Sequence, residues 1–141
     1  MARTFRLAGL LRLRQVQEEQ AASDLAAANA RSRENAARQN RARAALGGVG
    51  AEATSSNVLY AIAAARSSSR SMLAELEAVD VHNRADVADA AAAYAAARAR
   101  SLGLEKLEQR HIETRDAGDL AAQQAVVDEI ATNRPKSGDP Q

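Results

Sequence analysis

The chain of 141 residues contains no proline before Pro135, and this feature limits its fold more than any other. A proline inside a helix removes a backbone hydrogen bond and clashes with the preceding turn, so its absence leaves nearly the whole chain free to be helical. The one strong interruption is "LGGVGAEATSSN", residues 46–57. Its glycines predict a helix C-cap and a turn, and its Thr, Ser and Asn residues predict the N-cap of a new helix.

These signals predict two helices and no strand. The expected elements are an N-cap at Thr4, a helix over about 5–46, a turn over 47–54 and a second helix over about 55–133. The sustained alternation and β-branched runs that mark strands are absent. We therefore expect an all-α fold, in which two long helices form an antiparallel coiled-coil hairpin and the second helix is the longer one. This single domain covers 1–134, and a disordered tail follows over 135–141.

Composition favours a coiled coil over a compact core. Hydrophobic residues make up 46% of the chain, but alanine accounts for much of this fraction and aromatic residues for only 2%. Alanine is the strongest helix former and lets two helices approach closely, whereas a globular core depends on larger side chains. A chain rich in Ala, Glu, Arg and Leu is typical of a long helix or coiled coil.

Residues at coiled-coil spacing trace a seam along both helices. In the first helix the steps of three and four connect Leu7, Leu11, Ala21, Leu25, Ala28, Ala42 and Leu46, interrupted by Arg14, Glu18, Ser32, Asn35 and Gln39. In the second helix they connect Ile62, Met72 or Leu73, Leu76, Val79, Val87, Ala90, Tyr94, Ala97, Leu104 and Leu107. Because several positions are polar or only alanine, we expect a marginally stable, dynamic seam.

The net charge of +1 hides opposite charges on the two halves of the chain. Residues 1–46 hold nine Arg and four acidic residues (+5), and residues 75–130 hold twelve acidic residues and six Arg or Lys (−6). This asymmetry favours antiparallel pairing of the halves. Nucleic-acid binding needs a net basic face and often stacking aromatics, so no nucleic-acid partner is expected. The run "RSRENAARQNRARAAL" is either a solvated face that complements the acidic helix or a docking patch for an acidic partner.

The helices differ enough in length to leave part of the second one unpaired. At about 1.5 Å per residue, the first runs roughly 60 Å and the second nearly twice that. We therefore expect the second helix to lack an internal partner from about residue 105 onward. This stretch carries the apolar residues Leu107, Ile112, Leu120, Val126, Val127 and Ile130. An apolar stripe without an intramolecular partner predicts an intermolecular one.

One pair of residues raises the question of a metal site. Glu108 and His111 form a Glu-x-x-His pair, which is one half-site of a di-iron carboxylate bundle. Such a bundle needs two half-sites, and His82, the other histidine, has no Glu three positions before it. We therefore interpret the pair as part of a solvated or seam-edge helix face and expect no metal.

No other pattern predicts catalysis or a cofactor. The "GGVG" segment lacks the Lys-Ser/Thr of a phosphate-binding loop, and serines 67–69 have no base at usable spacing. Glu75 and Glu77 are two residues apart, so on a helix they point in different directions. The chain has no cysteine to act as a nucleophile or thiolate ligand. We expect a non-enzymatic protein without catalytic, cofactor-binding or metal sites.

A membrane-spanning segment is also not expected, because no apolar run reaches the length of a bilayer. The N-terminal "MARTFRLAGLLRLRQ" is basic and free of acidic residues, which leaves a transit peptide or a membrane-surface helix as alternatives to the first turns of an amphipathic helix. Arg6 and Arg12 interrupt its apolar run and no small-residue cleavage site follows, so a secretory signal is not expected.

At both ends the sequence resembles the flagellar export protein FliJ family, short cytoplasmic coiled-coil proteins of the bacterial flagellar type III secretion apparatus. The opening "FRLAGLLRLRQVQEEQAASDLAAANA" is similar to the family's apolar and basic start. The segment "LEKLEQRHIETRDAGDLAAQQAVVDEIA" has the family's Leu/Glu/Lys run, the Arg after it and a closing Asp-Glu-apolar-Ala. Tyr94 falls where an aromatic often precedes that run. The resemblance covers nearly the whole chain, although the alanine-rich middle differs from more charged and aromatic members.

The resemblance implies a stalk, similar to the central stalk of the rotary ATP synthase, that docks in the hexameric ring of the export ATPase. It also implies contacts with the cytoplasmic domain of the export gate and with export chaperones, a monomeric free state, and a cytoplasmic location at the inner-membrane export apparatus. The expected contacts with the ATPase ring are Leu10, Leu11, Leu107, Ile112, Leu120, Val126, Val127 and Ile130. The expected contacts with the export gate are Ile62, Met72, Leu73 and Leu76.

The sequence is also consistent with two other classes of protein. One is a structural or scaffold coiled coil that self-assembles through the unpaired end of the second helix. The other is a stalk-type subunit of an injectisome or a rotary ATPase, which would be built on the same physical principles.

Overall fold

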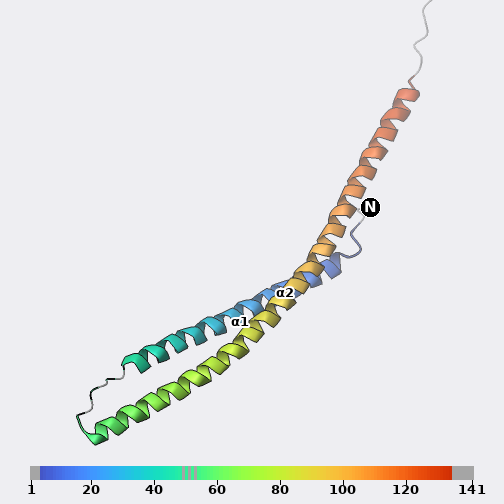
Figure 1. Ribbon diagram of the computed structural model, residues 1–141. Coiled ribbons are helices and arrows are strands. Elements are labelled where there is room, and N and C mark those ends of the chain that lie inside the picture. The colour runs from blue at the N-terminus through green and yellow to red at the C-terminus, as the bar shows by residue number, and fades with distance from the viewer. Residues whose placement is uncertain (1–3, 49, 51, 53, 135–141) are drawn as a thin grey trace, which may run out of the picture. The chain divides into compact units, whose positions relative to one another are not determined.

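Two long helices make up nearly all of the computed structural model, which describes residues 4–48, 50, 52 and 54–134. Helix α1 spans Ala8–Gly48 and helix α2 spans Ser56–Thr132 (Figure 1). The all-α prediction is confirmed: the helices pack against each other as an antiparallel coiled-coil hairpin, α2 is the longer one, and the described residues include no strand. The tail predicted over 135–141 lies outside the described residues.

The chain is organised as two units, and each unit takes a part of both helices. One unit is Val16–Arg98, which contains the turn of the hairpin. The other combines Met1–Gln15 with Ala99–Gln141.

The two helices begin in different ways. Ser55 is the N-cap of α2, because the backbone N–H of Val58 donates to its Oγ over 3.3 Å, as the Ser/Thr/Asn cluster predicts. The predicted N-cap at Thr4 is wrong, since α1 begins only at Ala8, after a turn in which the Ala8 N–H donates to the Phe5 carbonyl over 3.1 Å. The glycine C-cap expected for α1 is not formed in its usual left-handed conformation, because no described glycine has a positive φ.

Within the Val16–Arg98 unit, the buried and half-buried residues recur in alternating steps of three and four, which is the spacing of a coiled coil. On α1 this seam consists of Glu18, Ala21, Leu25, Ala28, Ser32, Asn35, Gln39, Ala42 and Leu46. On α2 it consists of Ile62, Arg66, Ser69, Leu73, Leu76, Asp80, Asn83, Val87, Ala90, Tyr94 and Ala97. The seam predicted for α1 is confirmed from Glu18 to Leu46, including the polar residues that interrupt it. Leu7 was also predicted as a seam residue and this is wrong, because it is exposed and precedes α1.

In this unit the structure settles one alternative in the predicted seam of α2 and corrects one position. Met72 is exposed and Leu73 half-buried, so Leu73 is the seam residue of that pair. Val79 is not a seam residue as predicted, because it is exposed and the half-buried Asp80 takes the seam position. The seven-residue repeat therefore determines which positions lie in the seam, even where the seam position holds a charged side chain and the residue before it is apolar.

Polar side chains form hydrogen bonds across this seam. The side-chain amides of Asn35 and Gln39 on α1 both donate to the backbone carbonyl of Leu76 on α2, over 3.0 and 3.2 Å. In the opposite direction, the Asn83 amide donates to the carbonyl of Arg31 over 3.4 Å. These bonds can form only when the two helices keep one alignment, so they fix the register of the hairpin.

Two ion pairs join the halves of the chain, but only the pair of Arg43 and Glu77 follows the predicted charge distribution, because in the other pair the basic residue lies on α2 and the acidic residue on α1. Arg98 Nη1 lies 2.9 Å from Glu18 Oε1, and Arg43 Nη2 lies 3.8 Å from Glu77 Oε1. Each pair connects α1 to α2. Pairs of this kind contribute little to stability when exposed, but they favour the antiparallel orientation.

In the second unit the seam continues from Ser101 through Leu104, Glu108 and His111 of α2. Leu11 of α1 is buried here, with 5% of its surface exposed. The Phe5 ring lies against the His111 ring, with their centroids 5.7 Å apart. Leu107, predicted as a seam residue, is exposed, and Glu108 holds the seam position instead. His111, which raised the question of a metal, therefore belongs to the end of the seam.

The unpaired part of α2 begins later than predicted. Every residue from Glu113 to Thr132 is exposed, whereas Ile112 is still half-buried, so the boundary lies near residue 113 and not near 105. Phe5 explains the difference because it precedes α1 and is not helical. A non-helical chain covers up to about 3.3 Å per residue, against about 1.5 Å in a helix, so a few residues reach further along α2.

Candidate functional site: the exposed end of α2

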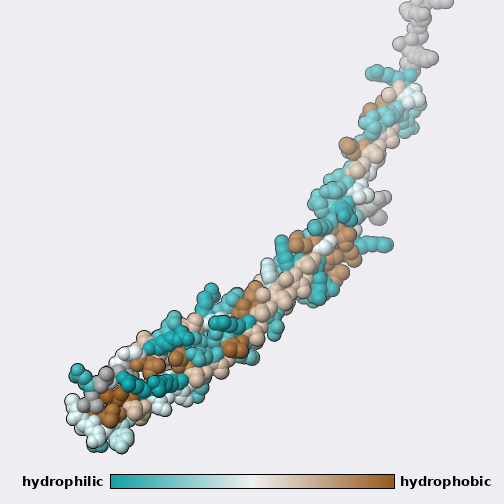
Figure 2. Space-filling view, in the orientation of Figure 1, coloured by the Kyte–Doolittle hydropathy of each residue, from teal (hydrophilic) through white to brown (hydrophobic). Residues whose placement is uncertain are grey.

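Residues 113–132 of α2, here called the terminal segment, form an exposed helix that still carries large apolar side chains. The exposed apolar residues are Leu120, Val126, Val127 and Ile130. Figure 2 shows apolar patches on this part of α2, separated by hydrophilic surface. An apolar face of this kind on a helix without a seam partner is typical of a protein–protein contact.

The apolar stripe of the terminal segment lies on a different face from the seam. Continuing the seam steps beyond His111 gives Arg115, Gly118, Ala122, Ala125, Glu129 and Thr132, and none of these is a large apolar residue. Ile112, Val126 and Ile130 each follow a seam position by one residue, which turns them by roughly 100° about the helix axis. The stripe is therefore not a continuation of the hairpin seam, and it faces another side of α2.

The terminal segment is acidic. Residues 113–132 contain five acidic side chains, Glu113, Asp116, Asp119, Asp128 and Glu129, and one basic one, Arg115, which gives a net charge of −4. Arg115 lies 3.5 Å from its neighbour Asp116. Asp128 accepts a hydrogen bond from Gln124 over 3.0 Å, within the same helix. The surface thus combines an apolar stripe with carboxylates, and it favours a basic partner.

The other predicted ring contacts differ in how accessible they are. Leu10 and Leu107 are exposed, and Ile112 is half-buried. Leu11 is buried in the seam, so a partner cannot reach it while the two helices remain paired. The accessible members of the predicted set are thus concentrated in the terminal segment, with Leu10 and Leu107 as exposed apolar residues nearby in the same unit.

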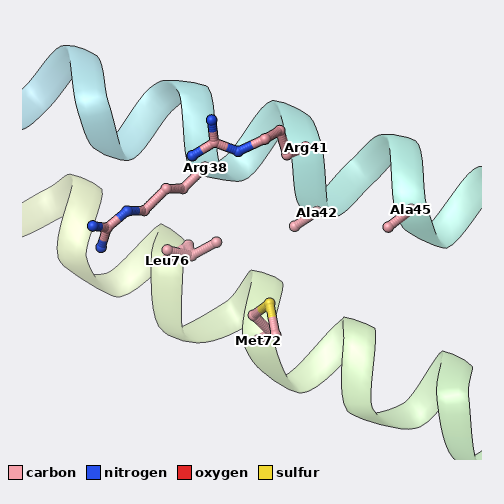
Figure 3. A pocket seen from close by; sticks show the side chains of 6 residues that line it. All are labelled: Arg38, Arg41, Ala42, Ala45, Met72 and Leu76. Carbon is pink, nitrogen blue, oxygen red and sulfur yellow. The ribbon is translucent and has the colours of Figure 1, made fainter.

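The four predicted gate contacts lie in the other unit. Ile62, Leu73 and Leu76 are half-buried seam residues, whereas Met72 has 54% of its surface exposed. Met72 and Leu76 are brought together in a groove of about 420 Å³ between the two helices. Its lining residues are Arg38, Arg41, Ala42 and Ala45 from α1 with Met72 and Leu76 from α2 (Figure 3).

One exposed apolar group at the start of α2 was not predicted from the sequence. Val58, Leu59 and Tyr60 follow the Ser55 cap and are exposed, Tyr60 to 75%. They are consecutive, so they point around the helix instead of forming one stripe, and a search for coiled-coil spacing passes over them. Their position directly after a helix cap was the available signal.

The Glu108 and His111 pair has surroundings typical of a packed helix face. Both residues are half-buried seam positions, and the His111 ring packs against Phe5. His82 Nε2 lies 3.3 Å from Asp86 Oδ2, one turn further along α2. Over the described ranges, no group of three or more His, Cys, Asp or Glu side chains comes together in a way that could hold a metal ion.

Comparison with known proteins adds no relative to this description. The chain matches no protein-family model, no curated protein and no solved structure. In the part of the chain that the structure describes, neither helix combines the length and apolar character needed to cross a membrane.

Proposed function

We propose that this chain is a non-enzymatic accessory protein of a flagellar-type type III export apparatus, and that it acts as a stalk docking on the hexameric export ATPase. In this proposal the terminal segment of α2 enters the ring, and the hairpin links the ATPase to the cytoplasmic domain of the export gate and to export chaperones. The protein is then cytoplasmic and peripherally associated with the inner membrane at the export apparatus.

One observation carries the proposal: α2 continues through 113–132 after the seam has ended, and it keeps a separate apolar stripe over that length. A helix exposed on all sides needs no large apolar residues for its own stability, so these residues are accounted for by a partner. A single helix end suits a partner with a narrow central opening, which a hexameric ring provides. The resemblance of both chain ends to the FliJ family supports the same assignment.

The proposal is tested by measuring ATP hydrolysis by the purified hexameric export ATPase of the same organism. The full chain is expected to stimulate hydrolysis, and a chain that ends at Ile112 is expected to lose this stimulation while its seam is retained. A full-length variant with Leu120→Ala, Val126→Ala, Val127→Ala and Ile130→Ala is expected to lose most of it. Alanine favours helix, so this variant keeps the terminal segment helical and removes only its apolar stripe.

A matched control uses an exposed apolar residue elsewhere on the molecule. Tyr60→Ala removes a large exposed side chain from the start of α2, outside the terminal segment, and is expected to leave stimulation unchanged. Full stimulation by the chain ending at Ile112, or an equal loss in the Tyr60→Ala control, would contradict the proposed role of the terminal segment.

A further inference from the structure

The groove between α1 and α2 combines an apolar floor with basic side chains. Ala42, Ala45, Met72 and Leu76 form its apolar part, and the only charged groups among its lining residues are arginines. Figure 3 shows Arg38 and Arg41 starting from α1, with Arg38 reaching toward α2. A helix with an apolar stripe and carboxylates beside it would complement this groove in shape and charge.

The basic character extends beyond the two lining arginines. Residues 31–46 of α1 contain five Arg and one Glu, for a net charge of +4. Arg38 pairs with Glu34 over 2.8 Å, but both side chains are more than half exposed, so this pair is weak and can be exchanged for another carboxylate. The surface around the groove therefore attracts an acidic segment.

The terminal segment of α2 has the matching properties. It carries a net charge of −4, and Asp116 and Asp119 lie three residues apart on the side of the helix that also bears Leu120 and Ile130. Arg38 and Arg41 have the same spacing of three residues. Two terminal segments would repel each other through their like charges, so they do not pair with one another.

We infer that a second copy of this chain covers the groove: the terminal segment of one molecule docks between α1 and α2 of another, with Asp116 and Asp119 facing Arg38 and Arg41. The contact is one helix in one groove, which is smaller than a stable protein–protein interface, so its dissociation constant lies at about 10–100 µM. The free chain is monomeric when dilute and associates as its concentration rises.

The docking between two copies does not depend on the proposed function, but its expected effect on partner binding does. The surfaces that cover each other in the associated state are the two assigned to the ATPase ring and the export gate, so association would keep unengaged molecules from binding either partner. Self-association is measured on the chain alone and ATPase stimulation with the partner. The two assignments can therefore fail separately.

The test is sedimentation equilibrium of the full-length chain at low and high salt. The wild-type chain is expected to associate at low salt, and the association is expected to weaken as salt screens the charges. Two charge-reversal variants, Arg38→Glu with Arg41→Glu and Asp116→Arg with Asp119→Arg, are each expected to weaken association at least about tenfold. An equimolar mixture of the two variants restores complementary charges and is expected to recover the wild-type level.

A control separates the docking geometry from net charge. Asp128→Arg with Glu129→Arg changes the charge of the terminal segment by the same amount on the side of the helix away from Asp116 and Asp119, and is expected to leave association nearly unchanged. Circular dichroism confirms that each variant remains helical. A wild-type chain that stays monomeric at several hundred µM overturns the inference, as does equal weakening by the control. Association that survives the arginine reversal indicates pairing between terminal segments and overturns it too.

Discussion

Asn35 of α1 donates a hydrogen bond from its side-chain amide to the backbone carbonyl oxygen of Leu76 on α2, over 3.0 Å. Asn35 is itself a buried residue, in a seam whose other buried residues are mostly alanine or polar. A buried amide in a coiled coil lowers stability relative to an apolar residue but favours one alignment of the helices. The register of the hairpin is therefore set more by a few polar contacts than by large apolar side chains.

The first prediction concerns the stability of Asn35 variants. Asn35→Ala removes the hydrogen bond without filling the seam, and it is expected to lower the free energy of unfolding by about 1 kcal/mol. Asn35→Leu places an apolar side chain in the seam and is expected to raise this free energy by a similar amount. Urea unfolding followed by circular dichroism measures both changes.

The same substitution is expected to affect the alignment of the helices. The chain has no cysteine, so Ala37→Cys on α1 and Ala78→Cys on α2 would place two spin labels at exposed positions without a competing thiol. In the labelled chain that keeps Asn35, the distances between the labels are expected to form one narrow distribution. In the labelled chain with Asn35→Leu, the distribution is expected to be broader or split. A single narrow distribution in both would show that Asn35 does not set the register.

Replacing Ser101 by alanine is expected to raise the free energy of unfolding, whereas Asn35→Ala is expected to lower it. The side chain of Ser101 is fully buried, and its Oγ has no hydrogen-bond partner among the residues that the structure describes. Removing a buried hydroxyl without a partner relieves a desolvation cost, so Ser101→Ala is expected to stabilise the chain by about 1 kcal/mol. Ser67→Ala is the matched control, because Ser67 is exposed and the same change there improves only helix propensity, by about 0.5 kcal/mol or less. Equal effects of the two variants on thermal unfolding would refute this explanation.

A third prediction concerns the ion pair between Arg98 and Glu18, which lie 2.9 Å apart. Arg98→Glu places two carboxylates together and is expected to lower stability by about 1 kcal/mol. The double variant Arg98→Glu with Glu18→Arg restores opposite charges and is expected to recover most of the loss. A double-mutant cycle at low and high salt measures the coupling, and a coupling energy near zero at low salt would show that the pair contributes nothing.

Phe5 tests where the seam ends. Its ring packs on His111, so Phe5→Ala is expected to speed amide hydrogen exchange around residues 104–112 of α2. Exchange around residues 73–87, in the other unit, is expected to stay unchanged. If exchange around 104–112 does not change in the variant, then the segment before α1 does not protect the end of the seam.

Much of this fold could be predicted from residue spacing. The polar residues Ser32, Asn35 and Gln39 were expected to interrupt the seam of α1, and they occupy its buried or half-buried positions. The errors on α2 have a common cause. Val79 and Leu107 are apolar and sit beside seam positions, so choosing by hydrophobicity displaced the seam by one residue from Asp80 and Glu108.

The position of the candidate site was harder to predict from sequence. Helix lengths alone predicted that the unpaired stretch starts near residue 105. The structure places this start near residue 113, because the non-helical residues before α1 also cover part of α2. The side of α2 that carries the apolar stripe of the terminal segment can be identified only relative to the seam, whose steps must be known up to His111. The groove around Met72 and Leu76 depends on how two helices pack, which spacing within one helix does not reveal.

Hydrogen exchange of the full chain, alone and bound to the hexameric export ATPase, tests the central claim most directly. For the free chain we predict fast exchange over residues 113–132, where α2 has no seam partner, and slower exchange over the seam up to His111. On binding, exchange is predicted to slow over 113–132, with the largest change around Leu120 to Ile130. Unchanged exchange over 113–132 in a bound complex, or slowing confined to the turn end of the hairpin, would contradict the claim.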